Sequence, residues 1–183
     1  MNKKAFTLLE LLVVVLIIGI LVAIAIPKYQ LSVDKSLFRK YQAMVVSLKD
    51  AYNDYMMRNG KGTSNFNDLS FSLPSDFKEV YQHGTVFTCV QNSDMFCCMS
   101  NYKKNSHSAI LDCGKNDLSL IAAINFANRD GEILSQRSRC YADANNARAT
   151  RVCKSFGGTT KYTSNIWTPK GLKENMPYYY VSK

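Results

Sequence analysis

The hydrophobic positions near the N-terminus form one long run. Between residues 6 and 26 the only polar side chains are Thr7 and Glu10, with Gly19 as the one glycine. A helix of this length spans roughly 30 Å, the thickness of the hydrocarbon core of a bilayer. The run is apolar on every face, which argues against the buried core helix of a soluble protein. The pattern therefore predicts a transmembrane helix over residues 6–27.

After Pro27 the hydrophobic residues recur with a helical period. They follow three- and four-residue steps, and they are Leu37, Tyr41, Met44, Val45, Leu48, Tyr52 and Tyr55. Pro27 is expected to interrupt the helix locally, because proline lacks the N–H group and clashes with the preceding turn. Asn59 and Gly60 are typical of a helix C-terminus. We therefore predict that residues 28–60 form an amphipathic second half of the same helix, about 50 residues in all.

The remaining residues, 61–183, predict a β-rich globular domain. Asn, Asp, Ser and Gly clusters separate short apolar runs, as in an antiparallel meander. The runs are residues 85–90, 96–102, 109–113, 118–126 and 131–138. The run 118–126 contains Ala122 and Ala123 and could instead form a short helix.

The segments on either side of these runs carry weaker signals. Residues 63–78 are expected to form a connecting loop, and the chain from Cys140 onward is polar and is expected to be irregular. Residues 178–181 are expected to add a last edge strand. The expected fold class is therefore α+β, with a long N-terminal helix packed on a C-terminal antiparallel sheet.

Length and charge add little to this picture. The 183 residues fit one domain with an anchor, and the net charge is +9. The last third is richest in cations, namely Arg129, Arg137, Arg139, Arg148, Arg151 and Lys154. Such a surface favours anionic partners, including nucleic acid. A subunit that captures DNA with this basic third is a further interpretation, which stays weak because the sequence has no clear stripe of arginines interleaved with aromatic residues.

The six cysteines all follow the apolar run and predict disulfides in an oxidising compartment. They are Cys89, Cys97, Cys98, Cys113, Cys140 and Cys153. The adjacent residues Cys97 and Cys98 should point to opposite faces of a strand and take different partners. The first four cysteines allow three pairings, and spacing does not choose between them. Because no Cys-x-x-Cys pair occurs and neither histidine has ligand-like spacing, we expect no metal site.

Motifs for catalysis are absent from the sequence. It has no phosphate-binding glycine loop, no nucleophile elbow and no metalloprotease helix. We therefore expect no enzyme activity, no catalytic residue and no cofactor.

The order of signals at the N-terminus differs from that of a secretory signal peptide. A signal peptide has a small-residue cleavage site after its apolar core, and residues 24–28 offer only a poor one. Here the small residue, Ala5, precedes the apolar run. The first 29 residues combine Lys3 and Lys4, the small residue Ala5, Phe6, Glu10 four residues after Phe6, and Pro27 at the far end. In these residues and their spacing they resemble the N-terminus of type IV prepilins and of the related pseudopilins.

The resemblance implies a processing pathway. In that family a membrane peptidase, the prepilin peptidase, cuts on the cytoplasmic side and N-methylates the new terminus. Applied to this chain, the resemblance implies that residues 1–5 are the leader, that the cut falls between Ala5 and Phe6, and that Phe6 becomes methylated. The family usually has Gly where this chain has Ala5. The precursor would be a single-pass inner-membrane protein with a cytoplasmic N-terminus, and an inner-membrane assembly platform would build it into a periplasmic or extracellular pilus.

Glu10 has a physical reason to act in assembly. A carboxylate inside an apolar segment is costly in lipid and is functional by default. We expect Glu10 to neutralise the free amine of a neighbouring subunit and so to fix the register between packed helices. The resemblance also implies that the stretch between Gly19 and Pro27 loses helical structure in the filament. A simple kink at Pro27 is the alternative.

The resemblance bears on the cysteines and on the function as well. Cys140 and Cys153 enclose a polar loop like the disulfide-closed C-terminal region of many pilins, which predicts that they pair. The function implied is a structural subunit of a type IV pilus, as a homopolymer or with co-pilins, serving adhesion, motility or DNA uptake. The alternative is a pseudopilin of a type II secretion system. The cysteine-rich tail favours a pilin.

Overall fold

One helix dominates the molecule. The computed structural model describes residues 7–83, 87–101, 109–129, 132–134, 138–158 and 160–181. Helix α1, Leu8–Asn59, has 52 residues and ends at Gly60, whose φ of 66° is left-handed and whose N–H group donates to the carbonyl of Met56. A long helix of about 50 residues was predicted, and it is confirmed. The expected interruption at Pro27 was wrong, because α1 continues through this residue. Proline removes one ladder bond, and the turns on either side keep theirs.

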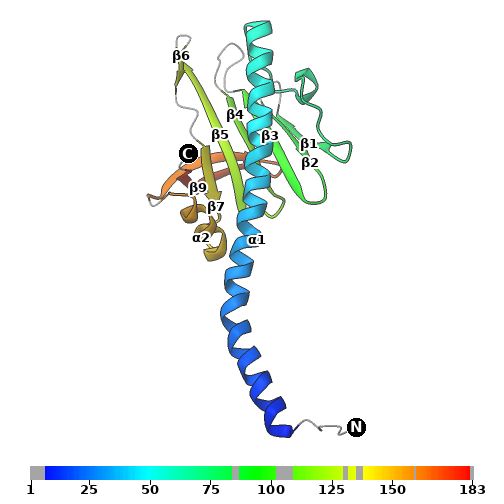
Figure 1. Cartoon of the computed structure of the whole chain (residues 1–183). Coiled ribbons are helices and arrows are strands. Elements are labelled where there is room, and N and C mark those ends of the chain that lie inside the picture. Colours follow the sequence, from blue (N-terminus) through cyan, green and yellow to red (C-terminus); the bar gives the residue numbers. More distant parts are fainter. Residues whose placement is uncertain are drawn as a thin grey trace.

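The two halves of α1 have different surroundings (Figure 1). The lower half projects away from the rest of the molecule, and its apolar side chains are exposed. The upper half lies against the sheet. Four predicted positions are buried there, Tyr41, Val45, Leu48 and Tyr52, whereas Leu37 remains 37% exposed. Met44 and Tyr55 are partly buried against the same core, so the predicted stripe is confirmed except at its start, where Phe38 is fully buried instead of Leu37.

The globular part is a curled antiparallel sheet. Its strands are β1 (Lys78–His83), β2 (Phe87–Gln91), β3 (Met95–Asn101), β4 (Ala109–Lys115), β5 (Leu120–Arg129), β6 (Glu132–Leu134), β7 (Ser138–Ala142), β8 (Tyr162–Thr168) and β9 (Gly171–Tyr180). The order is β1-β2-β3-β4-β5-β7-β9-β8, and β6 pairs with β5. The predicted α+β class and the meander from β2 to β5 are confirmed. Residues 120–129 form a strand rather than the alternative short helix.

Two expectations for the C-terminal third were wrong. The chain after Cys140 is regular, because it contains most of β7, helix α2 (Ala147–Ser155) and the β8–β9 hairpin. The last strand is not an edge, since β9 lies between β7 and β8. Two further elements lie in or beside the predicted loop, namely β1 and a 3-10 turn over Phe66–Asp68. Sheet position depends on partners that are far away in sequence, and local composition does not reveal them.

The sheet has a core on each face. One core lies between the sheet, α1 and α2, and it includes Phe38, Leu48 and Leu111. The other core lies on the opposite face, where Ile166 and Met176 of the curled β8–β9 hairpin pack over Phe96. All residues of β3 are buried, because both of its faces are covered. A strand buried on both faces has no polar alternation, so β3 reads as a nearly continuous apolar run.

Candidate functional site

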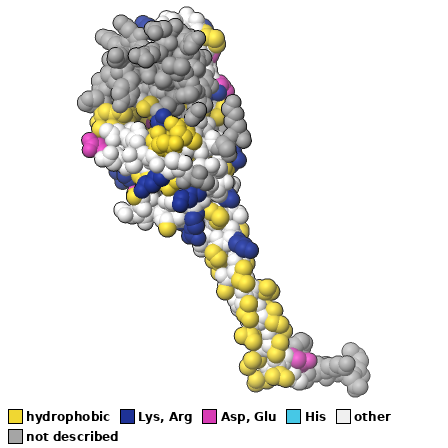
Figure 2. Space-filling view, turned by 90° about the vertical axis from the view of Figure 1, so that its left-hand side faces the viewer, with side chains coloured by type: hydrophobic (Ala, Val, Ile, Leu, Met, Phe, Trp, Pro, Cys, Tyr) yellow, Lys and Arg dark blue, Asp and Glu magenta, His cyan; other side chains and the backbone are white. Residues whose placement is uncertain are grey.

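The apolar half of α1 is the largest candidate site. It includes a stretch that is long and apolar enough to cross a membrane, and none of that stretch is buried inside the monomer. Figure 2 shows it as an almost continuous hydrophobic rod below the globular part. An exposed apolar surface of this extent marks contact with lipid or with other protein.

Glu10 lies in the first turn of this rod. Its carboxylate accepts a hydrogen bond from the N–H group of Thr7 at 2.8 Å and another from the Thr7 hydroxyl at 2.7 Å. The Thr7 hydroxyl in turn accepts from the N–H group of Glu10 at 3.2 Å, which completes a capping box. The monomer thus holds the carboxylate at the N-terminal tip of the helix. The predicted processing residues, Ala5 and Phe6, lie outside the described residues.

Gly19 and Pro27 lie within the regular part of α1. A Cβ atom placed on Gly19 would meet nothing within 4 Å among the described residues. Monomer packing therefore does not require glycine at this position. The physical effect of Gly19 that remains is its low helix propensity, which weakens α1 at this point.

The three disulfides tie the globular part together. Cys140 of β7 pairs with Cys153 of α2, with Cα atoms 5.4 Å apart. Cys97 pairs with Cys113 across β3 and β4, and Cys89 pairs with Cys98 across β2 and β3. The adjacent cysteines do take different partners, one in each core. Their pairing follows from strand register, which the sequence alone did not reveal.

Asp112 was not singled out from the sequence. It lies in β4, is 1% exposed, and its Oδ2 atom has no hydrogen-bond partner among the described residues. Burial raises the pKa of this carboxyl well above its usual range. The one available signal was a lone carboxylate within the apolar run 109–113. No group of three or more His, Cys, Asp or Glu side chains among the described residues is placed to hold a metal ion.

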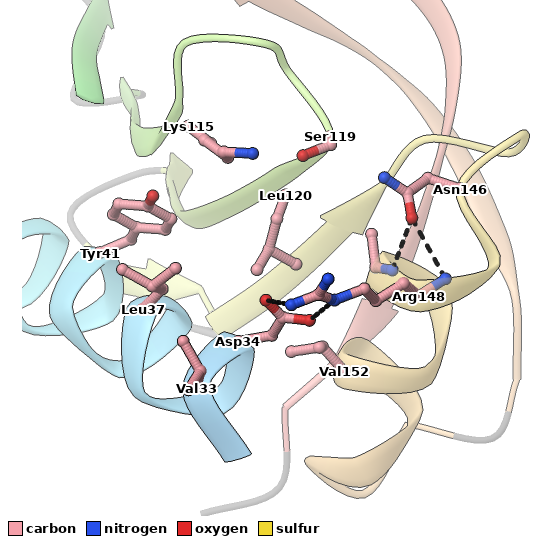
Figure 3. Close-up of a pocket in the computed structure, with 11 residues that line it drawn as sticks. Val33, Asp34, Leu37, Tyr41, Lys115, Ser119, Leu120, Asn146, Arg148 and Val152 are labelled. Atoms are coloured by element: carbon pink, nitrogen blue, oxygen red, sulfur yellow. Dashed lines mark hydrogen bonds and ion pairs between the residues drawn. The ribbon is translucent and has the colours of Figure 1, made fainter. Parts of the chain in front are cut away.

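A small cavity lies where α1, α2 and the turn between β4 and β5 meet (Figure 3). Its volume is about 300 Å³. Asp34 of α1 binds the Arg148 guanidinium of α2 through both carboxylate oxygens, and the Nη2–Oδ1 distance is 2.9 Å. Asn146 caps α2 by accepting from the N–H groups of Arg148 and Ala149. Burial and the nearby Asp117 raise the pKa of Tyr41 at the cavity wall, which keeps this hydroxyl neutral.

An arginine and several tyrosines meet on the other side of the sheet. The Arg139 guanidinium lies 4.6 Å from the ring centroid of Tyr178 and 5.6 Å from that of Tyr180. The ring of Tyr162 stacks on Tyr178 at 5.5 Å. Burial raises the pKa of Tyr178 to about 12. These residues come from β7, β8 and β9, so their spacing in the sequence could not show the cluster.

Comparison with known proteins points to one family. Residues 1–26 match the family model described as the prokaryotic N-terminal methylation motif. The chain is 34% identical over 97 residues to the type IV major pilin protein PilE1 of Neisseria gonorrhoeae, which covers 50% of this chain and 54% of that protein. It is 32% identical over 79 residues to a fimbrial protein of Neisseria meningitidis, covering 43% and 46%.

A third relative comes from Thermus thermophilus. The type IV narrow pilus major component PilA5 is 42% identical over 52 residues, which covers 28% of this chain and 45% of that protein. The chain thus spans about half the length of the curated relatives it matches. No solved structure matches it.

Proposed function

We propose that the chain belongs to the type IV pilin family and is a prepilin, cut before Phe6 and assembled through α1 into an extracellular pilus. Type IV pilins are structural subunits and not enzymes. The observation that carries the proposal is the contrast between the two halves of α1. The apolar half is exposed in the monomer, whereas the other half packs against the folded domain. Such a helix needs lipid before assembly and other helices after it.

Processing is the first step of the proposal. The prepilin peptidase cuts between Ala5 and Phe6, removes the leader of residues 1–5 and methylates the amine of Phe6. The match of residues 1–26 to the methylation motif supports this assignment. Ala5 is the smallest replacement for the glycine that is usual at this position, and it keeps the site accessible. Residues 61–183 form the exported domain.

Assembly is the second step. The inner-membrane platform transfers α1 from lipid into a bundle of helices, alone or with co-pilins. Glu10 leaves its hydrogen bonds to Thr7 and pairs with the Phe6 amine of a neighbouring subunit, which fixes the axial register. The stretch between Gly19 and Pro27 unwinds during packing, because glycine favours the helix least among ordinary residues and Pro27 already lacks one ladder bond.

The relatives favour a pilin over a type II secretion pseudopilin. The three relatives described above carry the names of pili or fimbriae. Three disulfides in the globular part suit a filament that is exposed outside the cell. The pilus built from this subunit serves adhesion, motility or DNA uptake.

Filaments sheared from cells that express the chain provide the test. Electron microscopy should show long filaments, and mass spectrometry should find the chain as their main component. Its N-terminal peptide should begin with methylated Phe6. A peptide that retains residues 1–5, or a chain absent from the sheared filaments, would contradict the proposal.

A further inference from the structure

The base of the globular part is strongly basic. Seven cations lie in residues 28–40 of α1 and in α2, and they are Lys28, Lys35, Arg39, Lys40, Arg148, Arg151 and Lys154. We name these seven residues the basic collar. The same two segments contain one carboxylate, Asp34, so they hold +6 of the chain's net charge of +9. Figure 2 shows Lys and Arg side chains gathered where the globular part meets the rod.

The collar is a built surface rather than a flexible charged tail. Lys28, Lys35 and Arg39 are seven and four residues apart and follow one face of α1. Helix α2 is fixed beside this row, because Arg148 pairs with Asp34 and Phe156 packs on Phe38 with centroids 4.8 Å apart. The Arg39 guanidinium also lies 4.5 Å from the Phe156 ring centroid. The disulfide between Cys140 and Cys153 anchors α2 from its other side.

The lower part of the collar lies at the height of a membrane surface when the apolar half of α1 spans the bilayer, whereas Arg39 and Lys40 lie roughly 20 Å beyond Ile26. At about 1.5 Å per residue, Lys28 lies roughly 3 Å beyond Ile26, and Asp34, which marks the level of α2, lies roughly 12 Å beyond it. The polar headgroup layer is roughly 5–8 Å thick on each side of a bilayer. Lys28 is therefore within the headgroups. The cations of α2 lie within about one Debye length of them, which is about 8 Å at physiological salt.

We propose that the basic collar binds the headgroups of anionic phospholipids in the membrane that holds the precursor. The inference rests on the proposed membrane-anchored prepilin. Positive charge next to a membrane span recognises anionic lipid electrostatically. The anchor holds the collar beside the lipids at a high effective concentration, so no separate encounter is needed. The exposed side chains of Val33 and Leu37 at the cavity mouth add apolar surface at the same level.

The test uses the full chain reconstituted in phosphatidylcholine bilayers. A trace of spin-labelled phosphatidylglycerol or phosphatidylcholine reports the fraction of each lipid that is immobilised at the protein. The wild-type chain should prefer phosphatidylglycerol severalfold, because each cation that reaches the headgroups adds roughly fivefold in affinity. The preference should vanish at about 1 M salt, where the Debye length is about 3 Å.

Two variants locate the effect. The side chains of Arg151 and Lys154 are exposed and form no hydrogen bond or ion pair among the described residues, so R151Q/K154Q should stay folded and show a clearly weaker preference, part of which Lys28 retains. The matched control, Lys61→Glu, changes the charge by the same two units beyond the C-terminal end of α1 and should leave the preference unchanged. Equal immobilisation of both lipids by the wild-type chain, or an equal loss in the control, would overturn the proposal.

A third outcome separates lipid from nucleic acid. Duplex DNA added to the chain in phosphatidylcholine nanodiscs should not bind at physiological salt. DNA binding that R151Q/K154Q abolishes, without a preference for phosphatidylglycerol, would assign the collar to nucleic acid and overturn the lipid proposal. A chain that immobilises neither lipid does not span the bilayer, which would contradict the proposed prepilin instead.

Discussion

Asp112 shows how a single residue can link stability to pH. In β4 it is paired with Cys98 of β3 and Ala123 of β5, on the face of the sheet that the second core covers. Burial favours the neutral carboxyl and raises its pKa above the ordinary value of 3.8. The folded chain therefore keeps a proton at this residue that the unfolded chain releases.

The stability of the wild-type chain should fall as the pH rises from about 4 through the raised pKa of Asp112. In that window the folded state binds more protons than the unfolded state, so the slope is negative and reaches about 1.4 kcal/mol per pH unit. Asp112→Asn cannot titrate and should lack this fall. Denaturant unfolding of the full chain in detergent, repeated across pH, measures both slopes. Asp50→Asn, at an exposed position of α1, should keep the wild-type slope.

The disulfide between Cys140 and Cys153 closes a short loop and fixes α2. The two cysteines are 13 residues apart, and both are fully buried. C140S/C153S should lower the free energy of unfolding by about 3 kcal/mol, because the unfolded chain regains the entropy that the crosslink removes. Chemical unfolding of the oxidised full chain checks this value. An unchanged midpoint in the variant would show that packing alone holds α2.

At the scale of the element, α1 joins an assembly surface to a folded domain. Its amphipathic half packs on β4 and β5, and its register decides which residues enter the core. Phe38 is fully buried against Phe156, whereas its neighbour Leu37 faces the cavity mouth at 37% exposure. Substitutions at these two neighbouring positions therefore distinguish a loss of core packing from a change at the surface of the same helix.

Phe38→Ala should lower the free energy of unfolding by about 3 kcal/mol, through lost burial and the cavity left behind. Leu37→Ala serves as its control and should cost less than about 1 kcal/mol, because the side chain is partly exposed. Thermal or denaturant unfolding of the full chain in detergent compares the two. Equal costs would contradict the difference in burial between Phe38 and Leu37.

At the scale of the whole molecule, the apolar half of α1 suits contact with lipid or other helices, and the globular part suits contact with water. The apolar half of α1 carries one carboxylate, Glu10, which the monomer holds through Thr7. This pairing within the chain raises a second explanation for any defect in a Glu10 variant. Such a variant changes the helix cap as well as the contact with a neighbouring subunit, and variants at Thr7 separate these two effects.

Glu10→Gln should leave the chain inserted in the membrane but reduce filament yield by at least about tenfold. An uncompensated buried amine costs about 3–5 kcal/mol in the packed filament. Sheared filaments and membrane fractions, quantified by immunoblot, give the two readouts. Thr7→Val removes the cap but keeps the carboxylate, and it should assemble normally. Failure of both variants would assign the defect to the helix cap rather than to the contact between subunits.

Much of this protein follows from local sequence. The apolar run 6–26, the stripe that begins after Pro27 and the stop at Gly60 predict the long helix, because helix formation depends on neighbours three and four residues away. The N-terminal motif predicts the family for the same reason, since all of its parts lie within 29 consecutive residues. The runs that became β2 to β5 were also predicted, because each is joined to the next by a short connection.

Only the tertiary structure decided the rest. The pairing of Cys89 with Cys98 and of Cys97 with Cys113 depends on strand register. The internal place of β9, the cluster around Arg139 and the basic collar each join segments that are far apart in the chain. Contacts of this kind are set by how the sheet curls and by which face of each helix it buries. Local periodicity predicted most of the buried stripe of α1 but carries no information on how the sheet curls, so the burial of Phe38 and the regular C-terminal third became visible only in the fold.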